Sequence, residues 1–372
     1  MGISKTEYDR RYAAIRAQMK KDGLDSILVA GLPDDFNRGN IRYITGNGRG
    51  GYCIFPVEGK PVLLSSSLLA NSPKAPKTME AYDLLTIRET MDTPNQVVKE
   101  LKALNRGGSI GLVGINCISI PAYLALKEAF GDKIVEVNTY FRPFREIKSA
   151  EEIEKLRTSA AIADKVYRRL REIIRPGLSE YAIYGEVKKI IYGEGCEYSF
   201  DLLDAAGSMM NMAFYPTTDA LEENGTLFME ISPSYQGYYA QLPVTLPVVK
   251  YSDQVLQMVK AWNYSDTNVH PMLKPGTKVI DIYHKLVGAI EEKGFKSPLR
   301  PGHSVGLDIL DFWSVDDTEP DAVLKAGMVI AIHPCSITKL GGDGVGMGYT
   351  YLITESGYER FSKINLAEEL IG

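Results

Sequence analysis

A helical sequence pattern occurs twice in this chain of 372 residues, over residues 175–195 and 274–294. Each copy consists of a Pro-Gly break, a polar capping residue, an amphipathic segment and a closing glycine. Proline and glycine interrupt helices, whereas apolar residues at helical spacing build one buried face, so each copy predicts a helix with defined ends. The repeat of a whole pattern predicts two α/β halves of similar build.

A longer helix is expected directly before the first copy, over roughly residues 149–174. Ser149 and Glu152 have the spacing of a capping box, in which each side chain satisfies a free N–H group of the first turn. Ser179 is expected to open the next helix in the same way. These signals predict two consecutive helices at the start of a second domain.

The residues before this region alternate between helical and extended segments. Residues 5–22 carry apolar side chains at helical spacing, and residues 40–56 are typical of a strand, a glycine-rich turn and a second strand. Such alternation indicates an α/β domain. The chain length favours two domains, and we place them at residues 1–142 and 143–372.

The stretch from residue 226 to 247 predicts two neighbouring strands. Residues 233–237, Pro-Ser-Tyr-Gln-Gly, have the composition of the turn between them. Glu230 lies in the middle of the first, otherwise apolar strand, and Gln241 lies on the second. Burial of an unpaired acid is costly, so Glu230 is expected to have a partner or a function.

The composition is that of an ordinary globular protein. The net charge of −5 disfavours a nucleic-acid surface, and we find no apolar run long enough to span a membrane. The four cysteines are scattered without metal-binding or disulfide spacing, which favours a reduced, cytoplasmic protein. We therefore expect no nucleic-acid and no membrane partner.

Five segments resemble the creatinase / aminopeptidase P / methionine aminopeptidase (M24, "pita-bread") superfamily. They are the hairpin around Glu230 and residues 145–164, 302–311, 325–334 and 344–359. The resemblance implies an α/β (α+β) protein with a creatinase-like N-terminal domain and a C-terminal pita-bread domain with internal pseudo-symmetry. It also implies a homodimer in which the N-terminal domain of one subunit lies near the pocket of the other.

Metal-using members of that superfamily hold two divalent ions with two aspartates, a histidine and two glutamates. The positions that match this set here are Glu230, Gln241, His303, His333 and Gly348. Hard divalent ions prefer anionic oxygens, and only one carboxylate remains. A functional dinuclear aminopeptidase is therefore not expected.

The resemblance to creatinase, which works without metal, instead favours a metal-independent hydrolase of C–N bonds or a lyase. Its substrate would be a small organic acid or amide, no cofactor would be needed, and peptidase activity is not expected. His303, His333 and Glu230 would be the catalytic residues, because imidazoles beside a carboxylate form an acid/base set near neutral pH.

Two alternatives remain open. In the first, His303 and His333 bind a single iron or zinc ion together with Glu230 or Gln241. In the second, the chain is a non-catalytic pita-bread protein that binds a partner. The residues expected to bind a small-molecule substrate are Gln241, Tyr215, Phe214, Tyr238, Tyr349, Asp308, Phe36 and Arg38.

Overall fold

The computed structural model describes residues 2–65 and 73–372. The chain divides into two units, Met1–Arg145 and Glu146–Gly372, and each has its own core. Within the described part, no helix is both long and apolar enough to cross a bilayer.

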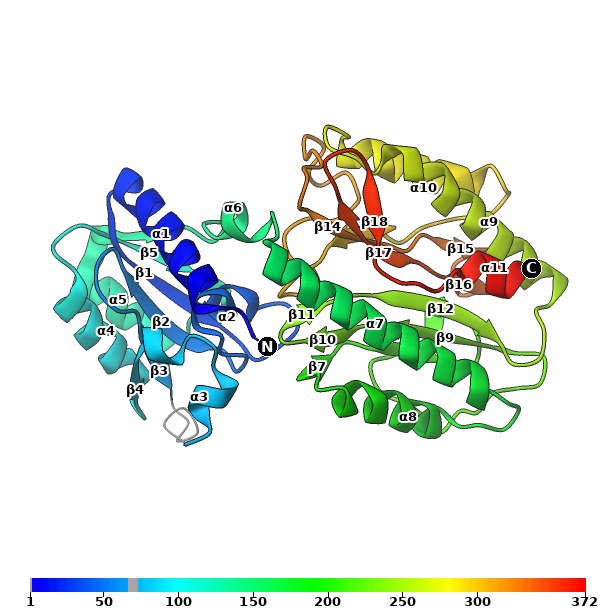
Figure 1. The fold of residues 1–372 in the computed structure, drawn as a ribbon, viewed down its shortest axis with the longest axis horizontal. Helices are drawn as coiled ribbons and strands as arrows, with labels where there is room; N and C mark the ends of the chain where they lie inside the picture. Colours follow the sequence, from blue (N-terminus) through cyan, green and yellow to red (C-terminus); the bar gives the residue numbers. More distant parts are fainter. Residues whose placement is uncertain (1, 66–72) are drawn as a thin grey trace. The chain divides into compact units, whose positions relative to one another are not determined.

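A six-stranded mixed sheet with the strand order β4-β3-β2-β1-β5-β6 forms the centre of the first unit (Figure 1). The strands are β1 (Leu24–Gly31), β2 (Gly51–Pro56), β3 (Val62–Ser65), β4 (Thr86–Glu89), β5 (Ser109–Val113) and β6 (Ile134–Glu136). The helices are α1 (Lys5–Asp22), α2 (Gly39–Thr45), α3 (Ala75–Thr78), α4 (Thr93–Leu104), α5 (Ile120–Phe130) and α6 (Arg142–Arg145).

Alternation along the strands explains why helices cover both faces of this sheet. Leu28 of β1 belongs to the same apolar cluster as Val97 of α4 and Leu126 of α5. On the other face, the rings of Tyr12 in α1 and Phe55 in β2 meet edge to face, with centroids 5.0 Å apart.

The structure corrects the strand predicted at the start of residues 40–56. Gly39–Thr45 is the helix α2, which ends at Gly46 in the left-handed conformation with φ 69°. The Thr45 hydroxyl donates to the carbonyl of Ile41 at 2.6 Å, so it caps the last turn from within. The apolar residues of this short segment fit either element, and local periodicity did not separate them.

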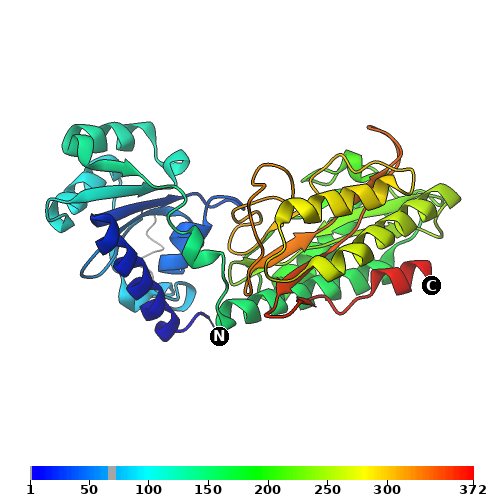
Figure 2. The ribbon, with the colours of Figure 1, turned by 90° about the horizontal axis from the view of Figure 1, so that it is seen from above.

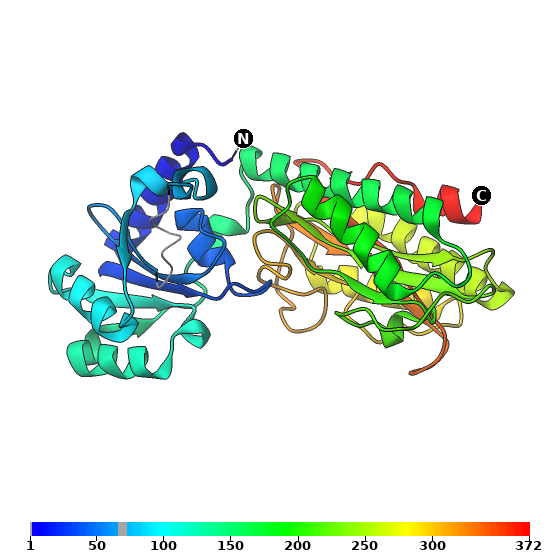
Figure 3. The same ribbon diagram turned by 90° about the horizontal axis from the view of Figure 1, so that it is seen from below.

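The second unit contains the two consecutive helices predicted at its start. They are α7 (Ala150–Ile173) and α8 (Glu180–Gly193), which lie side by side (Figure 3). The capping box of Ser149 and Glu152 is present, and Ser179 accepts a hydrogen bond from the N–H group of Ala182. These predictions are confirmed, because capping is a local signal.

The second copy of the helical pattern forms α10 (Val279–Glu291), which packs beside α9 (Asp253–Val269) (Figure 2). Its N-cap is Lys278, whose side chain makes no capping hydrogen bond. A short helix, α11 (Leu366–Ile371), ends the unit.

The strands of this unit form small antiparallel sheets between the two helical pairs. The first half contains β7 (Tyr198–Ser199), β8 (Leu202–Asp204), β9 (Thr226–Ile231), β10 (Pro233–Tyr235), β11 (Tyr238–Tyr239) and β12 (Leu242–Pro247). The second half contains β13 (Gly302–Ser304), β14 (Val329–Ile332), β15 (Cys335–Ile337), β16 (Gly344–Gly346), β17 (Tyr349–Ile353) and β18 (Tyr358–Arg360). The predicted mixed α/β class is confirmed.

The hairpin around Glu230 is longer than the sequence indicated. Residues 233–235, predicted as part of the turn, form β10 and pair with β11. The turn consists of Gln236 and Gly237 alone, with φ 50° and 89°. Two consecutive residues with positive φ are typical of a tight hairpin turn, so a five-residue loop is not needed.

Candidate functional site

Glu230 lies at the centre of a three-stranded sheet. On β9 it pairs with Pro243 of β12 on one side and with Leu202 of β8 on the other, and only 8% of the residue is exposed. The predicted neighbour Gln241 donates from Nε2 to Oε1 of Glu230 at 2.6 Å. The Ser232 hydroxyl donates to the same oxygen at 3.4 Å.

Burial raises the pKa of Glu230 from its ordinary value of 4.5 to about 7, although the hydrogen bond from Gln241 acts in the opposite direction. The negative charge of Asp201 contributes to this rise in the pKa. Glu230 therefore exchanges its proton near neutral pH, as a general acid or base must.

The two predicted histidines also come together. His303 lies on β13, His333 directly follows β14, and their ring centroids are 5.1 Å apart. The Nδ1 atom of His303 lies 3.0 Å from the carbonyl oxygen of Ser304, which can only accept, so Nδ1 carries the proton. The Nε2 atom of His333 is buried and has no hydrogen-bond partner in the described part of the chain.

Both imidazoles are neutral at physiological pH. Burial and, to a smaller extent, the positive charge of Arg300 lower the pKa of His333 from 6.5 to about 4. Burial also holds the pKa of His303 well below its ordinary value, and His333 adds to this effect. Because Nδ1 of His303 is protonated, its Nε2 carries a lone pair, and the Nε2 atom of His333 has no hydrogen-bond partner among the described residues.

The backbone leaves no room for a side chain at Gly348. A β-carbon on Gly348 would lie 2.6 Å from Cα and Cβ of His333 and would clash with the carbonyl oxygen of Ile332. The backbone beside His333 therefore occupies the space that a side chain at position 348 needs.

The described residues do not supply a ligand set for two cations. Among residues 2–65 and 73–372, no three His, Cys, Asp or Glu side chains come together as metal ligands. Glu230 consequently does not share a ligand set with the two histidines. What remains is a pair of imidazoles without a carboxylate in the same group, and imidazole is a ligand for borderline ions such as zinc or iron.

The aromatic residues predicted to bind substrate lie in different places. Phe214 and Tyr215 are 56% and 79% exposed, and the ring of Phe214 meets that of Phe200 edge to face. Tyr238 is buried, and its hydroxyl donates to Glu152 at 2.9 Å. Tyr349 is also buried, and its hydroxyl accepts from the N–H group of Leu366 beside α11.

The remaining predicted residues belong to the first unit and to the loop after β13, residues 305–313, which we call the histidine loop. Asp308 is buried in the loop after β13, where its N–H group donates to the carboxylate of Asp311 at 3.3 Å. In the first unit, Phe36 is 47% exposed, whereas Arg38 is buried with its guanidinium 3.5 Å from Asp35. The structure thus gathers Glu230 with Gln241 and His303 with His333, and it does not bring the whole predicted set together.

Two charged residues beside the site were missed. Asp201 is buried, holds Lys188 at 2.6 Å and accepts from the N–H group of Ser232, next to Glu230. Arg300 is exposed and forms no hydrogen bond or ion pair with any residue that the structure describes. Its place three residues before His303 was the only signal in the sequence.

Comparison with protein families assigns both parts of the chain. Residues 154–355 match the model of metallopeptidase family M24, and residues 11–147 match the creatinase/prolidase N-terminal domain. Uncharacterized peptidases from several strains of Staphylococcus aureus are 29% identical over 238 residues, which is 62% of this chain. The chain spans about 65% of the length of these curated relatives.

Solved structures with the same fold include a Xaa-Pro dipeptidase from Bacillus anthracis (TM-score 0.82, 20% identity, 96% of this chain and 98% of that chain). A prolidase from Pyrococcus horikoshii superposes equally well (TM-score 0.82, 22% identity, 96% and 99%). So does an X-Pro aminopeptidase from Thermotoga maritima (TM-score 0.83, 18% identity, 95% and 98%). The predicted family and the two-domain fold with a pita-bread C-terminal domain are confirmed.

The functional expectation from the sequence is wrong. A metal-independent, creatinase-like hydrolase or lyase without peptidase activity conflicts with a metallopeptidase family model, with relatives named peptidases and with a fold shared with prolidases. The expectation assumed that a chain without the family's metal-binding carboxylates cannot hydrolyse peptide bonds. Ligand identity limits which ions are held, and it does not by itself define the bond that is cleaved.

Proposed function

Because the chain belongs to metallopeptidase family M24, we propose that it is a peptide-bond hydrolase that uses one divalent cation held by His303 and His333. The observation that carries this proposal is the buried Nε2 of His333, which has no partner among the described residues and lies beside the ring of His303. The solved structures of this fold indicate which substrates to test first, namely peptides with proline after the scissile bond.

The histidine pair is suited to bind the cation without prior loss of a proton. Both rings are neutral, because burial lowers their pKa values, and the Ser304 carbonyl holds the His303 proton on Nδ1. When bound, a divalent cation polarises the scissile carbonyl group as a Lewis acid. With only two protein ligands, we expect weak and readily reversible binding.

Glu230 is the proposed general base and acid. Its pKa of about 7 allows it to take a proton from the attacking water and to return it to the leaving amine. The Gln241 amide fixes one oxygen of Glu230, while its own Oε1 is buried without a partner within the described ranges. That oxygen is available to accept a hydrogen bond from a peptide N–H group of the substrate.

Two features support a substrate with an apolar side chain and an anionic end. Phe214 and Tyr215 expose aromatic surface, and Phe200 supports the ring of Phe214. The guanidinium of Arg300, which has no hydrogen-bond or ion-pair partner among the described residues, is suited to bind a carboxylate, because it presents two parallel N–H donors. A small dipeptide carries both kinds of group.

The proposal is tested by hydrolysis of a panel of dipeptides after removal of metal and addition of manganese, zinc, cobalt or iron(II) separately. We expect turnover of X-Pro dipeptides only with added cation, and loss of turnover in His333→Ala. His284→Ala, on the exposed side of α10, is the matched control and should keep full activity. Equal turnover in the presence of a strong chelator, or no turnover of any peptide with any cation, would contradict the proposal.

The assembly and location remain predictions. A homodimer is supported only by the family resemblance, and sedimentation of the purified chain measures it. A cytoplasmic location is supported by four cysteines that all remain free thiols, of which three are buried.

A further inference from the structure

A buried ion pair lies behind the histidine loop, outside the residues that make up the proposed site. Lys148 Nζ lies 3.0 Å from Oδ2 of Asp311, and their side chains are only 2% and 1% exposed. Loss of one partner from such a pair typically costs about 3–5 kcal/mol, whereas apolar residues of similar size often stabilise a fold equally well. Stability alone therefore does not explain why charges occupy these positions.

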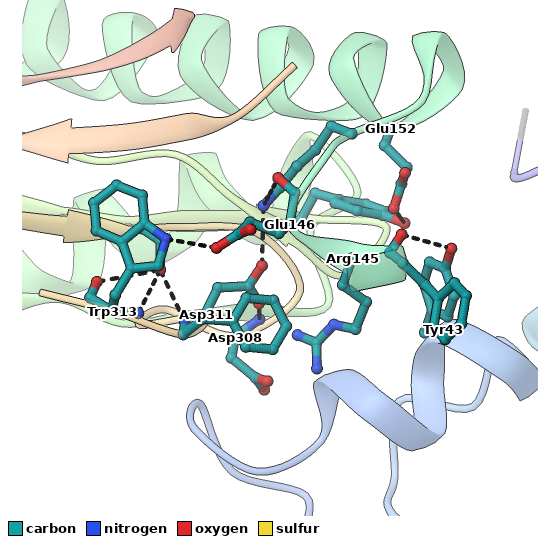
Figure 4. A network of polar contacts seen from close by, with 12 residues as sticks. Tyr43, Arg145, Glu146, Glu152, Asp308, Asp311 and Trp313 are labelled. Carbon is teal, nitrogen blue, oxygen red and sulfur yellow. Dashed lines mark hydrogen bonds and ion pairs between the residues drawn. The ribbon is translucent and has the colours of Figure 1, made fainter. Parts of the chain in front are cut away.

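The pair belongs to a short strap formed by residues 146–148. Figure 4 shows the indole of Trp313 directed at Glu146, and its Nε1 atom donates to Oε1 of Glu146 at 2.9 Å. The backbone of Lys148 is held in turn, because its N–H group donates to the carbonyl of Gly327 at 2.9 Å. The strap thus fixes the histidine loop at two of its residues, Asp311 and Trp313.

The loop closes onto Ser304, the residue after His303. The N–H groups of Phe312 and Trp313 donate to the Ser304 hydroxyl at 2.8 and 3.0 Å. The N–H group of Asp311 donates to the Ser304 carbonyl at 3.0 Å, and this carbonyl also accepts from Nδ1 of His303. The group that selects the His303 tautomer is therefore bonded to the backbone of the residue that Lys148 holds.

Close packing leaves little freedom in this connection. A β-carbon on Gly306 would lie 2.5 Å from Oδ2 of Asp311 and 3.1 Å from Cε of Lys148. The other oxygen of Asp311 accepts from the N–H group of Asp308. Both oxygens of this carboxylate thus hold defined positions, one toward the strap and one toward the loop.

We infer that Lys148 and Asp311 are positioning residues for His303. They hold the Ser304 carbonyl where it keeps the His303 proton on Nδ1 and leaves the Nε2 lone pair available. The effect on the tautomer does not depend on the proposed function, whereas the expected effect on cation binding rests on it.

The test uses the full chain labelled with ¹⁵N in its histidine side chains. The chain has only four histidines, so the His303 signals are identified from their absence in His303→Gln. In Lys148→Met/Asp311→Leu, we expect His303 to lose its single Nδ1–H form and the affinity for Zn²⁺ to fall about 10- to 100-fold, as for other residues that orient metal ligands.

The control replaces another buried ion pair, between Glu7 and Arg11 of the first unit, whose side chains are 6% and 1% exposed. Glu7→Leu/Arg11→Met should leave the His303 signals and the Zn²⁺ affinity unchanged. If the first double variant does not fold, Lys148→Met/Asp311→Asn keeps an acceptor for the Asp308 N–H group and is compared in the same way.

A folded variant without the pair that keeps the His303 tautomer of the natural chain would overturn the inference. Absence of Zn²⁺ binding in the natural chain would instead contradict the proposed function, and the tautomer result would still decide the role of Lys148 and Asp311.

Discussion

The two halves of the second unit carry different chemistry. The half that contains β9 and β12 contributes Glu230, whose carboxylate is held by Gln241 and whose pKa lies near 7. The half that contains β13 and β14 contributes two neutral imidazoles, one of them without a partner within the described residues.

Burial acts on both halves, yet with opposite consequences. Loss of solvent disfavours the charged form of each group, so the acid keeps a proton at higher pH and the histidines lose theirs at lower pH. One half can therefore exchange a proton near neutral pH, while the other half offers lone pairs. This difference between the acid and the histidines leads to four predictions.

The largest expected effect is the loss of activity in variants of either half, and the two losses should differ in their dependence on cation concentration. We expect His333→Ala and Glu230→Gln each to reduce hydrolysis by at least about 100-fold. Activity of the histidine variant should recover partly at high cation concentration, because its defect is affinity, whereas the glutamate variant should not recover. Steady-state rates over a cation titration measure the difference, and identical responses of both variants would remove the distinction.

A substitution of Gly348 tests whether a further ligand side chain fits into the half that contains β13 and β14. Gly348→Ala should destabilise the protein by about 3 kcal/mol, because the new β-carbon meets the backbone of Ile332 and His333. The control is Gly288→Ala within α10, where nothing lies within 4 Å of an added β-carbon and where a gain of up to about 1 kcal/mol is expected. Denaturant unfolding measures both, and a tolerated Gly348→Ala would show that the position is open.

Stability as a function of pH should change in opposite directions when either half is altered. The pKa of Glu230 is raised in the fold, so its contribution is present below about pH 4.5 and is lost as the pH rises toward 7. The pKa of His333 is lowered, so its contribution is present above 6.5 and is lost as the pH falls toward 4.

Relative to the natural chain, Glu230→Gln should therefore gain stability as the pH rises from 4.5 to 7, by up to about 3 kcal/mol. His333→Gln should lose stability relative to the natural chain over pH 4 to 6.5, by a similar amount. Urea unfolding at several pH values gives both slopes. Parallel curves for the two variants would mean that the sites do not titrate as described.

The smallest effect concerns the two helices of similar sequence. Ser179→Ala should cost about 1 kcal/mol, because it removes the N-cap of α8. Lys278→Ser should add about as much, because α10 has no side-chain cap. Thermal unfolding checks both changes, and no gain from Lys278→Ser would show that the first turn of α10 is already satisfied.

The sequence was most informative where the signal was local. Ser149 and Glu152 cap α7 as expected. Gln241 hydrogen-bonds Glu230, but it lies between β11 and β12 and not within the predicted second strand. The short segment Gly39–Thr45 was misread because its apolar residues fit a strand or a helix, and the glycine that follows can end either element.

Other features depend on contacts that no local pattern reveals. Lys148 and Asp311 are 163 residues apart, so nothing near either of them indicated a buried pair. Tyr349 was expected to bind substrate, and no local pattern indicated that its hydroxyl accepts from the first residue of α11.

The central claim is that His303 and His333 bind one cation, whereas Glu230 transfers the proton. Calorimetric titration of metal-free protein with Zn²⁺ tests it most directly, in the natural chain and in His303→Ala, His333→Ala and Glu230→Gln. We predict one ion per chain, lost in both histidine variants and retained in Glu230→Gln. Two ions per chain, or binding that survives removal of either imidazole, would contradict it.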